Sequence, residues 1–436
     1  MGQERIILHV DVNSAFLSWS AVKRLREDPF CVDLRTVPSA VGGSVETRHG
    51  IITAKSIPAK KFGITTGEPV VKALQKCPGL ILVSSDWEAY REYSGAFIGI
   101  LREFSELVQQ ASVDEAYVDV TEAAAACAKE RECGQRDAAV RLADQIRRQV
   151  YRQLGFTVNV GISSNKLLAK MASDFEKPDR THTLWPEEIP DKMWPLPIES
   201  LYGCGGKTSE RLAGIGIITI KDAAAADLNL LQSFLGEKSG EYIYRASRGL
   251  GSDELSTQSE DAKSYSNEVT TAEDVTLQNY DQLVPPILSR LSEKVSERLK
   301  RDGVYGSTVT VTIKTNDFHR HTRQTGLETS TNEASVICGR AGDLLKGLLY
   351  ERNGIFDRGK GVRLIGVGVS SLDHGEYRQM DLEGFLREQE SQRRERRRKE
   401  QEETHRRVLQ EKKKRLEGMM QQVRQKYGED KIHRGM

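Results

Sequence analysis

Short apolar runs alternate with longer amphipathic stretches through the first part of the chain. Ile6–Val10 and Thr157–Ile162 have the length and composition of buried strands, and Ala111–Val120 also favours a strand. Helical spacing separates these runs, so the pattern predicts an α+β fold. The other elements predicted here are small strands between Arg35 and Thr53, a strand at Leu80–Val83, helices at Ser14–Leu25, Ala54–Phe62, Trp87–Val108 and Ala123–Gln153, and a helix capped near Ser163 or Ser164.

Proline positions and changes in composition divide the rest of the chain. Four prolines between residues 186 and 197 indicate a boundary near residue 187, and a small helical region follows to about Leu250. Residues 251–261 lack periodicity and are typical of a linker. Beyond them the pattern predicts a second α+β unit, with a helix at Tyr280–Lys300, strands at Ser307–Thr315 and His319–Thr325, a helix at Glu333–Tyr350 and a strand at Val362–Ser370.

Composition narrows the class of protein. A chain of 436 residues with 38% hydrophobic residues predicts several domains. The net charge of +1 hides an asymmetry, because residues 386–436 hold 17 Lys and Arg against 10 Asp and Glu. The six cysteines are scattered, which favours neither a zinc site nor a disulfide framework. No apolar run reaches the ~20 residues of a membrane span, and Met1–Arg5 shows no signal-peptide pattern, so we expect a cytoplasmic protein.

Two segments place carboxylates at or inside predicted strands. Asp11 ends the first apolar run, and Asp114 and Glu115 are adjacent within another. Burying ionised carboxylates is costly unless a cation compensates, and oxygen ligands of this kind suit Mg²⁺. Neighbours on a strand point to opposite faces, so Asp114 and Glu115 can converge only if a turn lies between or beside them. The alternative is that both acids merely occupy a hairpin turn.

Two further segments suggest phosphate binding. Gly161–Lys170 combines a strand end, a capped helix start and lysines, which favours an anion, although lysines on a helix are more often a solvated face. Leu201–Thr208 and Gly214–Ile217 read as two short helices around a glycine hairpin, which can present backbone amides to nucleic-acid phosphates. An ordinary helical turn is the alternative for this hairpin, since glycines also end helices.

Together these segments resemble the Y family of translesion DNA polymerases, particularly the bacterial DNA polymerase IV type. The likeness covers roughly residues 5–375. It implies a right-hand polymerase with an α+β fold, whose thumb contains a helix-hairpin-helix motif. The domains that it implies are a palm at 1–18 and 80–186, fingers at 19–79, a thumb at 187–250, a linker at 251–261, an α+β little finger at 262–373 and a charged helical tail at 374–436.

The resemblance also implies roles for residues around the predicted carboxylate site. Asp11, Asp114 and Glu115 correspond to catalytic metal ligands, with the carbonyl of Val12 as a further ligand, for two Mg²⁺ ions. Phe16 stands where the family places a steric gate against ribonucleotides, although a plain helix core residue is the alternative. Relatives grip the triphosphate with Tyr and Arg, where this chain reads Ser56–Lys61. The triphosphate-binding residues implied here are Lys177 and Lys60.

Contacts with DNA and with a sliding clamp are implied more indirectly. In the predicted little finger, Val309, Val311 and Ile313 would face the helices and leave Lys314 on an open face, with Arg320 and Arg323 beside it; an ordinary solvated face is the alternative. The residues implied to bind DNA backbone are Gly203, Gly205, Lys207, Lys314, Arg320 and Arg323. A loosened clamp-binding peptide is formed by Gln379, Leu382 and Phe385.

The function implied by the resemblance is DNA-templated addition of deoxynucleotides past damaged bases, with low fidelity and without proofreading. The expected partners are primer-template DNA, dNTP and a sliding clamp, and the expected state is a monomer without a membrane. Two alternatives remain. One is a catalytically silent DNA-binding or clamp-binding relative, against which the intact Asp11, Asp114 and Glu115 argue. The other is a cyclase or nuclease with palm-like strands. The glycine hairpin region argues against this second alternative.

Overall fold

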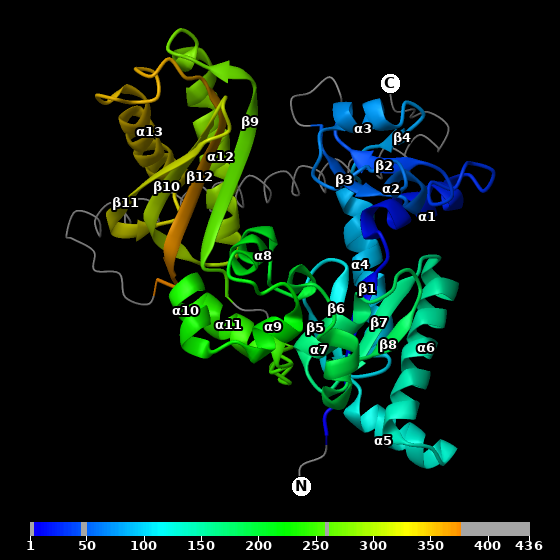
Figure 1. Ribbon diagram of the computed structural model, residues 1–436. Coiled ribbons are helices and arrows are strands. Elements are labelled where there is room, and N and C mark those ends of the chain that lie inside the picture. The colour runs from blue at the N-terminus through cyan, green and yellow to red at the C-terminus, as the bar shows by residue number, and fades with distance from the viewer. Residues whose placement is uncertain (1–3, 45–49, 258–260, 376–436) are drawn as a thin grey trace, which may run out of the picture. The chain divides into compact units, whose positions relative to one another are not determined.

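The computed structural model describes residues 4–44, 50–257 and 261–375 (Figure 1). They form two compact units, one up to Asp261 and one from Ala262 onward, and each is described by itself. Both units combine sheets with helices, so the predicted α+β class is confirmed. Within the described ranges, no helix is both long and apolar enough to cross a membrane.

A five-stranded sheet forms the centre of the first unit. Its middle strand, β1, is antiparallel to both neighbours, β6 and β7. All six residues of β1 are buried, which explains its continuous apolar run. The strand ends at Val12 and not at Val10, so Asp11 lies inside it. In spatial order the strands are β5 (Val108–Gln110), β6 (Glu115–Asp119), β1 (Ile7–Val12), β7 (Val158–Ser163) and β8 (Thr181–Thr183).

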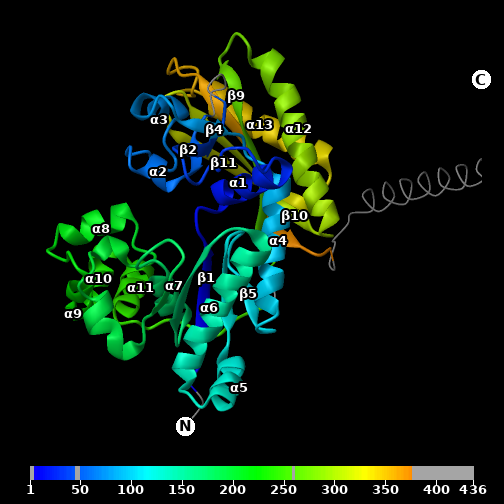
Figure 2. The same ribbon diagram turned by 90° about the vertical axis from the view of Figure 1, so that its right-hand side faces the viewer.

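Helices cover both faces of this sheet. Figure 2 shows α4 and α6 on one side and α7 on the other. Leu8 and Val10 pack into the apolar core with α4 and α6, whereas His9 points to the opposite face, where its Nδ1 lies 2.8 Å from Ser173 Oγ on α7. A Cβ on Gly161 of β7 would lie 2.0 Å from the Ala169 carbonyl oxygen, so only glycine permits this close approach of α7. The helices are α4 (Trp87–Arg102), α6 (Gln135–Leu154) and α7 (Lys166–Ser173).

Two helix predictions for this region were wrong. Ala123–Gln153 is not one helix, because the chain breaks at Glu132, whose φ is 49°, between α5 (Thr121–Arg131) and α6. The cap of α7 is Asn165 and not Ser163 or Ser164, since the Asn165 side chain accepts a hydrogen bond from the Leu168 amide at 2.9 Å. That side chain also satisfies an amide at the helix start that could otherwise have bound an anion.

A separate three-stranded sheet follows β1. Its order is β3, β2, β4, and β4 pairs in parallel with β2. The strand predicted at Leu80–Val83 therefore groups with residues 19–79 and not with the five-stranded sheet, which corrects the expected start of the second palm segment. Ala54 and Lys55 belong to β3, so the helix predicted at Ala54–Phe62 is shorter. The elements are α1 (Ala15–Glu27), β2 (Ser39–Gly42), β3 (Ile52–Lys55), α2 (Ile57–Lys60), α3 (Val70–Lys76) and β4 (Ile81–Val83).

The helical region after residue 187 is part of the same compact unit. Leu168 and Met171 of α7 share one apolar core with Leu212, Leu231 and Ile243. The predicted boundary near residue 187 therefore separates elements that still pack together. Three short turns at Pro186–Glu188, Ile189–Met193 and Ile198–Ser200 lead into α8 (Gly206–Ala213), α9 (Ile220–Ala225), α10 (Leu228–Leu235) and α11 (Glu237–Ser247).

The second unit is a four-stranded antiparallel sheet with two helices on one face. Val309, Val311 and Ile313 of β10 pack against α12 and α13, as predicted. The prediction missed β9, a largely polar edge strand that resembles a linker in sequence. In spatial order the strands are β11 (Arg320–Thr331), β10 (Tyr305–Thr315), β12 (Val362–Asp373) and β9 (Ser264–Val275), and the helices are α12 (Tyr280–Arg301) and α13 (Ala334–Tyr350).

Candidate active site

The three predicted carboxylates come together at one end of the five-stranded sheet. Asp11 on β1 and Glu115 on β6 are direct cross-strand partners, so both side chains project from the face that α7 covers. Asp114 lies in the turn before β6, and its carbonyl accepts a hydrogen bond of 3.0 Å from the Val12 amide. The turn that the sequence requires beside Glu115 is therefore confirmed, and it brings the third carboxylate next to β1.

Two lysines compensate the charges of these carboxylates. Lys170 is buried on α7, and its Nζ lies 2.9 Å from Glu115 Oε1, 3.3 Å from Asp174 Oδ2 and 3.9 Å from Asp11 Oδ2. Lys177 forms a short ion pair with Asp11 and a second one of 2.8 Å with Asp174. The anions near the lysines of Gly161–Lys170 are thus carboxylates of the protein itself. Lys170 was not singled out from the sequence.

The electrostatics of the cluster follow from burial and from these ion pairs. Burial raises the pKa of Asp11, and the Lys177 ammonium opposes this only in part. The His9 imidazole, whose Nε2 is 3.6 Å from Glu115 Oε2, and the Lys170 ammonium hold the pKa of Glu115 at about 2. Burial alone would lower the pKa of Lys170, but Glu115, Asp11 and Asp174 together raise it. Asp11 is therefore the carboxylate that most needs a nearby cation to remain ionised.

The oxygen atoms of the three carboxylates are suitable ligands for a hard divalent cation, but their positions in this structure do not yet form a binding site. Asp11, Glu115 and Asp114 supply carboxylate oxygens at one sheet end, as Mg²⁺ prefers. Among the described residues, however, no three His, Cys, Asp or Glu side chains already converge on one point. The Asp114 carboxylate accepts a hydrogen bond of 2.6 Å from Ser112, and Lys177 takes the place of a cation at Asp11. A rotation of Asp114 and withdrawal of Lys177 would free oxygens for an ion.

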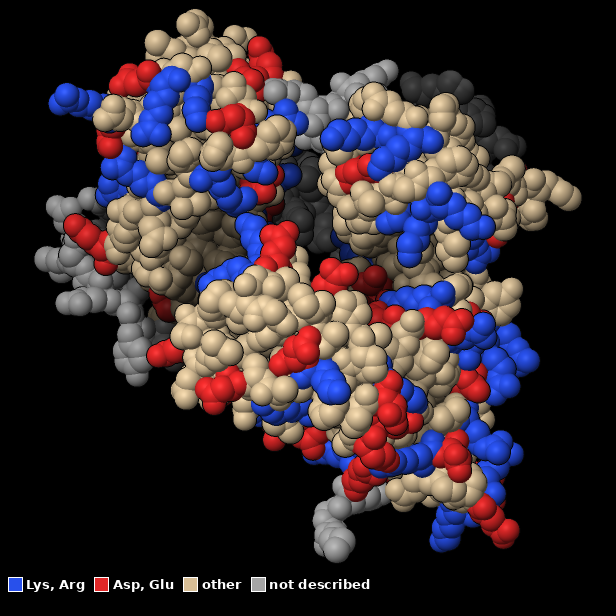
Figure 3. All heavy atoms as spheres, viewed as in Figure 1, with Lys and Arg blue, Asp and Glu red and all other residues tan. Residues whose placement is uncertain are grey.

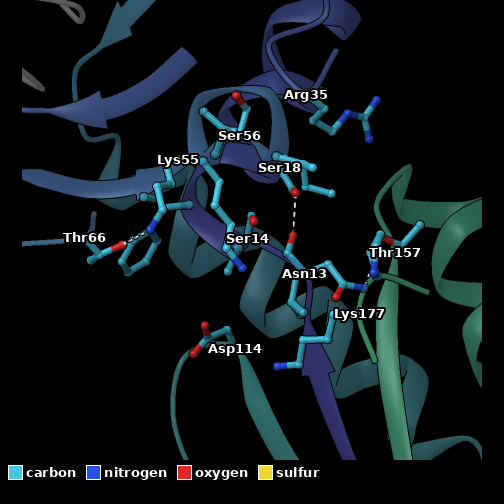
Figure 4. A pocket seen from close by; sticks show the side chains of 18 of the residues that line it. Asn13, Ser14, Ser18, Arg35, Lys55, Ser56, Thr66, Asp114, Thr157 and Lys177 are labelled. Atoms are coloured by element: carbon cyan, nitrogen blue, oxygen red, sulfur yellow. Dashed lines mark hydrogen bonds between the residues drawn. The ribbon is translucent and has the colours of Figure 1, made fainter. Parts of the chain in front are cut away.

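A pocket of about 680 Å³ opens above the carboxylates. Asp11, Val12, Asp114 and Lys177 line its floor, and residues of β3 and α2 line the opposite wall (Figure 4). Because the lining combines carboxylates and amines from two sheets, the pocket can receive a ligand that carries both metal ions and phosphates.

Phe16 lines this pocket and is held in an aromatic cluster. Its ring stacks on Tyr90, with centroids 4.8 Å apart, and meets the edge of Trp87 at 5.5 Å. Phe16 is half-buried, so part of the ring remains accessible from the pocket. Phe16 also packs against two apolar cores of this unit, and its position suits a rigid wall of the pocket.

The wall of the pocket opposite the carboxylates carries the predicted Lys60 and one lysine that sequence reasoning missed. Lys55 alternates on β3 with buried Ala54, and its Nζ donates a hydrogen bond of 3.1 Å to Thr66 Oγ1 (Figure 4). Burial, and then the Lys60 charge, lower the pKa of Lys55. Neither lysine forms an ion pair with a described residue, so both amines are available to an anion. Strand alternation within Ile52–Lys55 is the signal that could have identified Lys55.

The glycines predicted to bind DNA backbone lie at the start of α8. Gly203 has φ +83°, and a Cβ there would meet the Tyr242 ring at 2.6 Å. Gly205 caps α8, and Lys207 is exposed on its first turn. The glycine hairpin lies between α8 and α9, where Gly216 has φ +82°. The predicted pair of short helices around a glycine hairpin is therefore present.

In the second unit, the three basic residues predicted to lie on one face of the sheet lie on two different faces. Arg320 pairs with Lys314 across β11 and β10, so both lie on the open face of the sheet, where Arg320 also pairs with Glu268 at 3.0 Å. Arg323 instead pairs with Val311, which faces the helices, so its placement on the open face was wrong. Positions three residues apart on a strand point to opposite faces. Figure 3 shows Lys and Arg side chains, with acids between them, on the visible surface of this unit.

The clamp-binding peptide expected from the sequence falls at residues 379–385. Gln379, Leu382 and Phe385 lie outside the described residues, as does almost all of the charged tail.

Comparisons with known proteins match segments of both units. Residues 10–174 match the impB/mucB/samB family and residues 262–382 match its C-terminal domain, while residues 199–251 match the DNA polymerase-iota thumb domain. The chain is 36% identical over 380 residues to a protein of Clostridium acetobutylicum named DNA polymerase IV, which covers 87% of this chain and 90% of that protein. The chain belongs to the Y family of DNA polymerases.

Other relatives extend this likeness along the whole chain. The Y-family polymerase described here is 31% identical to DNA polymerase IV of Bacillus velezensis and to DNA polymerase IV 1 of Bacillus subtilis, over 100% of this chain and 93% of each relative. A solved structure of a chimeric Y-family DNA polymerase superposes with a TM-score of 0.71 and covers 84% of this chain and 98% of the chimera. At 23% identity, that structure supports the fold.

Proposed function

We propose that this Y-family polymerase is a DNA polymerase IV homologue that extends a primer with deoxynucleotides opposite and past damaged template bases. The observation that carries the proposal is the cross-strand pair of Asp11 and Glu115, with Asp114 beside it. They lie below a pocket whose opposite wall holds two lysines that form no ion pair with a described residue. Family membership supports DNA and dNTP as substrates.

The carboxylate end of the sheet would hold the catalytic metal ions. Asp11, Asp114 and Glu115, with the Val12 carbonyl, would be their ligands. Two divalent ions in such a site activate the attacking hydroxyl and stabilise both the entering and the leaving oxygen of an in-line displacement. The other requirements of the reaction, which are positioning and charge compensation, fall to side chains of the chain itself.

The lysines then compensate charge on the nucleotide. In the reaction the primer 3′-oxygen attacks the α-phosphorus, the bond to the bridging oxygen of the β-phosphate breaks, and pyrophosphate leaves. Lys177, once released from Asp11, can reach a phosphate in the same pocket, and Lys60 and Lys55 approach it from the opposite wall. Lys170 remains buried and positions Glu115. These amines replace part of the grip that the missing Tyr and Arg would supply.

Phe16 would select the sugar. A bulky ring beside the sugar leaves no room for a 2′-hydroxyl, and stacking on Tyr90 keeps the ring in place. The glycine-containing start of α8, with Lys207, and the open face with Lys314 and Arg320 would hold the DNA backbone. A sliding clamp remains an expected partner through Gln379, Leu382 and Phe385, and a monomer remains the expected state.

Primer extension with Mg²⁺ on an undamaged and an abasic template tests the proposal. Asp114→Asn keeps the shape of the side chain but removes its charge, so we expect extension to disappear while primer-template affinity remains similar. Asp144→Asn, which removes a carboxylate on α6 that pairs with Arg147, is the matched control and should extend both templates. Binding without extension by the unmodified chain would favour the catalytically silent alternative.

A further inference from the structure

The second unit contains a basic pocket that the polymerase reaction does not use. Its volume is about 340 Å³, and it lies between β11 and the end of α13. The residues that matter here are His321, Arg323, Glu351, Arg352 and Arg358. Three guanidinium groups and one carboxylate leave this pocket with an excess of positive charge.

The arginines of this pocket differ in how far they are already compensated. Arg323 pairs with Glu351 at 2.8 Å. Arg358 uses its Nε to bind the Asn353 carbonyl at 2.9 Å and has no carboxylate partner in the described ranges. Arg352 makes neither a hydrogen bond nor an ion pair with any described residue, and its side chain is exposed. Two of the three positive charges are therefore available to an incoming anion.

Two further residues shape this pocket. The Nε2 of His321 is buried and has no hydrogen-bond partner among the described residues, although His321 lines the pocket. That nitrogen is shielded from solvent, so a ligand in the pocket would meet other atoms of the imidazole ring. Gly347 on α13 also makes room, because a Cβ there would lie 2.2 Å from the Arg323 guanidinium. The position of Arg323 over the helix therefore depends on a residue without a side chain.

The pocket lies at the edge of the proposed DNA-binding face. Arg320 and Thr322 belong to the open face of β11, whereas His321 and Arg323 point to the other face, and Thr322 also lines the pocket. Since β11 is an edge strand, one short segment presents positive charge on both sides of the sheet edge.

We propose that this pocket binds a phosphate group, and that the phosphate belongs to a DNA strand that continues from the open face around the edge of β11. Arg352 and Arg358 neutralise the phosphate, and the His321 ring forms part of the wall beside it. The contact is to backbone and carries no base sequence, so it adds affinity and register to the polymerase without changing the chemical step.

The test is the salt dependence of primer-template binding by the full chain, with a short and a long duplex. Arg352→Gln removes one phosphate contact without breaking any bond within the described protein, so the slope of log affinity against log salt should fall by about 0.9. Between 50 and 150 mM salt this amounts to about a 2.7-fold smaller loss of affinity. Arg340→Gln, which removes an exposed arginine on α13 outside the pocket, is the matched control. Extension rates from saturated DNA should be equal in all three proteins.

Three other results would contradict the proposal that this pocket binds a phosphate of DNA. Equal slopes for the unmodified chain, Arg352→Gln and a second variant, Arg358→Gln, with both duplexes, would show that the pocket contacts no DNA. A thermal stabilisation by inorganic phosphate over chloride, at equal ionic strength, that Arg352→Gln removes without a change of slope would assign the pocket to a free anion. If Arg352→Gln and Arg340→Gln changed the slope equally, the effect would come from the loss of any positive charge and not from a contact in this pocket.

Discussion

Replacement of Gly161 by alanine tests how tightly the active-site face of the sheet is built. The added Cβ would lie 2.0 Å from the Ala169 carbonyl oxygen and 2.4 Å from the Ser173 amide nitrogen. Both are backbone atoms, so no side chain can rotate away, and α7 itself must shift. Overpacking of this kind costs about 3 kcal/mol, at the upper end of the usual range. For a unit of this size that lowers the melting temperature by about 6–12 °C.

The shift should also affect the reaction, because α7 carries Lys170. A displacement of the order of 1 Å at a positioning residue can reduce the rate about 100-fold. Thermal unfolding and single-turnover extension of Gly161→Ala measure the two effects together.

The matched control is Gly95→Ala in the middle of α4. No heavy atom lies within 4 Å of a Cβ built there, so the same substitution should stabilise the helix by about 1 kcal/mol. The reasoning is refuted if Gly161→Ala melts at or above the temperature of the unmodified chain, or if both variants shift it in the same direction.

Three further predictions concern the pocket and the carboxylates. Phe16→Ala should admit ribonucleotides and leave dNTP incorporation largely intact; unchanged sugar discrimination would disprove the gate. Lys55→Gln should raise the KM for dNTP severalfold with a smaller change in kcat, whereas Lys61→Gln, outside the pocket, should change neither. The pKa of Glu115 is lowered from 4.5 to about 2, so its ionised form contributes stability above pH 4.5 that is lost as pH falls toward 2. Denaturant unfolding should therefore depend less on pH in this window for Glu115→Gln; an equal dependence would contradict the proposed ion pairs.

Local periodicity predicted where the three carboxylates lie along the chain, and the family resemblance supplied the catalytic role proposed for them. Asp11 and the Asp114 and Glu115 pair could be assigned to strand ends, and the required turn beside Glu115 is present. Their partners could not be derived in the same way. Lys170 reaches Glu115 only because Gly161 lets α7 approach the sheet, and that contact spans 55 residues of sequence.

Other elements were missed or misplaced in the prediction because their composition does not reveal their structure. β9 contains few apolar residues, because only one of its faces packs on the core and it lies at a sheet edge. The sequence pattern therefore predicted no strand between the linker at 251–261 and the helix that begins at Tyr280. The break before α6 spans residues 132–134. Glu132 is in a left-handed conformation that is unusual for its residue type, and the extended Gly134 caps α6. The separation of Arg320 from Arg323 was derivable, since strand alternation alone places them on opposite faces.

The central position of β1 has a consequence for how the site can open. Its backbone is hydrogen-bonded on both sides and its side chains are buried on both faces, so its amide protons should exchange with solvent only when the unit unfolds globally. Asp11 and Val12 are therefore attached to the most slowly exchanging part of the unit. Asp114 lies in an exposed turn and can exchange through local fluctuations. Adjustment of the site to each new base pair should thus come from the turn, while β1 provides a fixed reference through every cycle of addition.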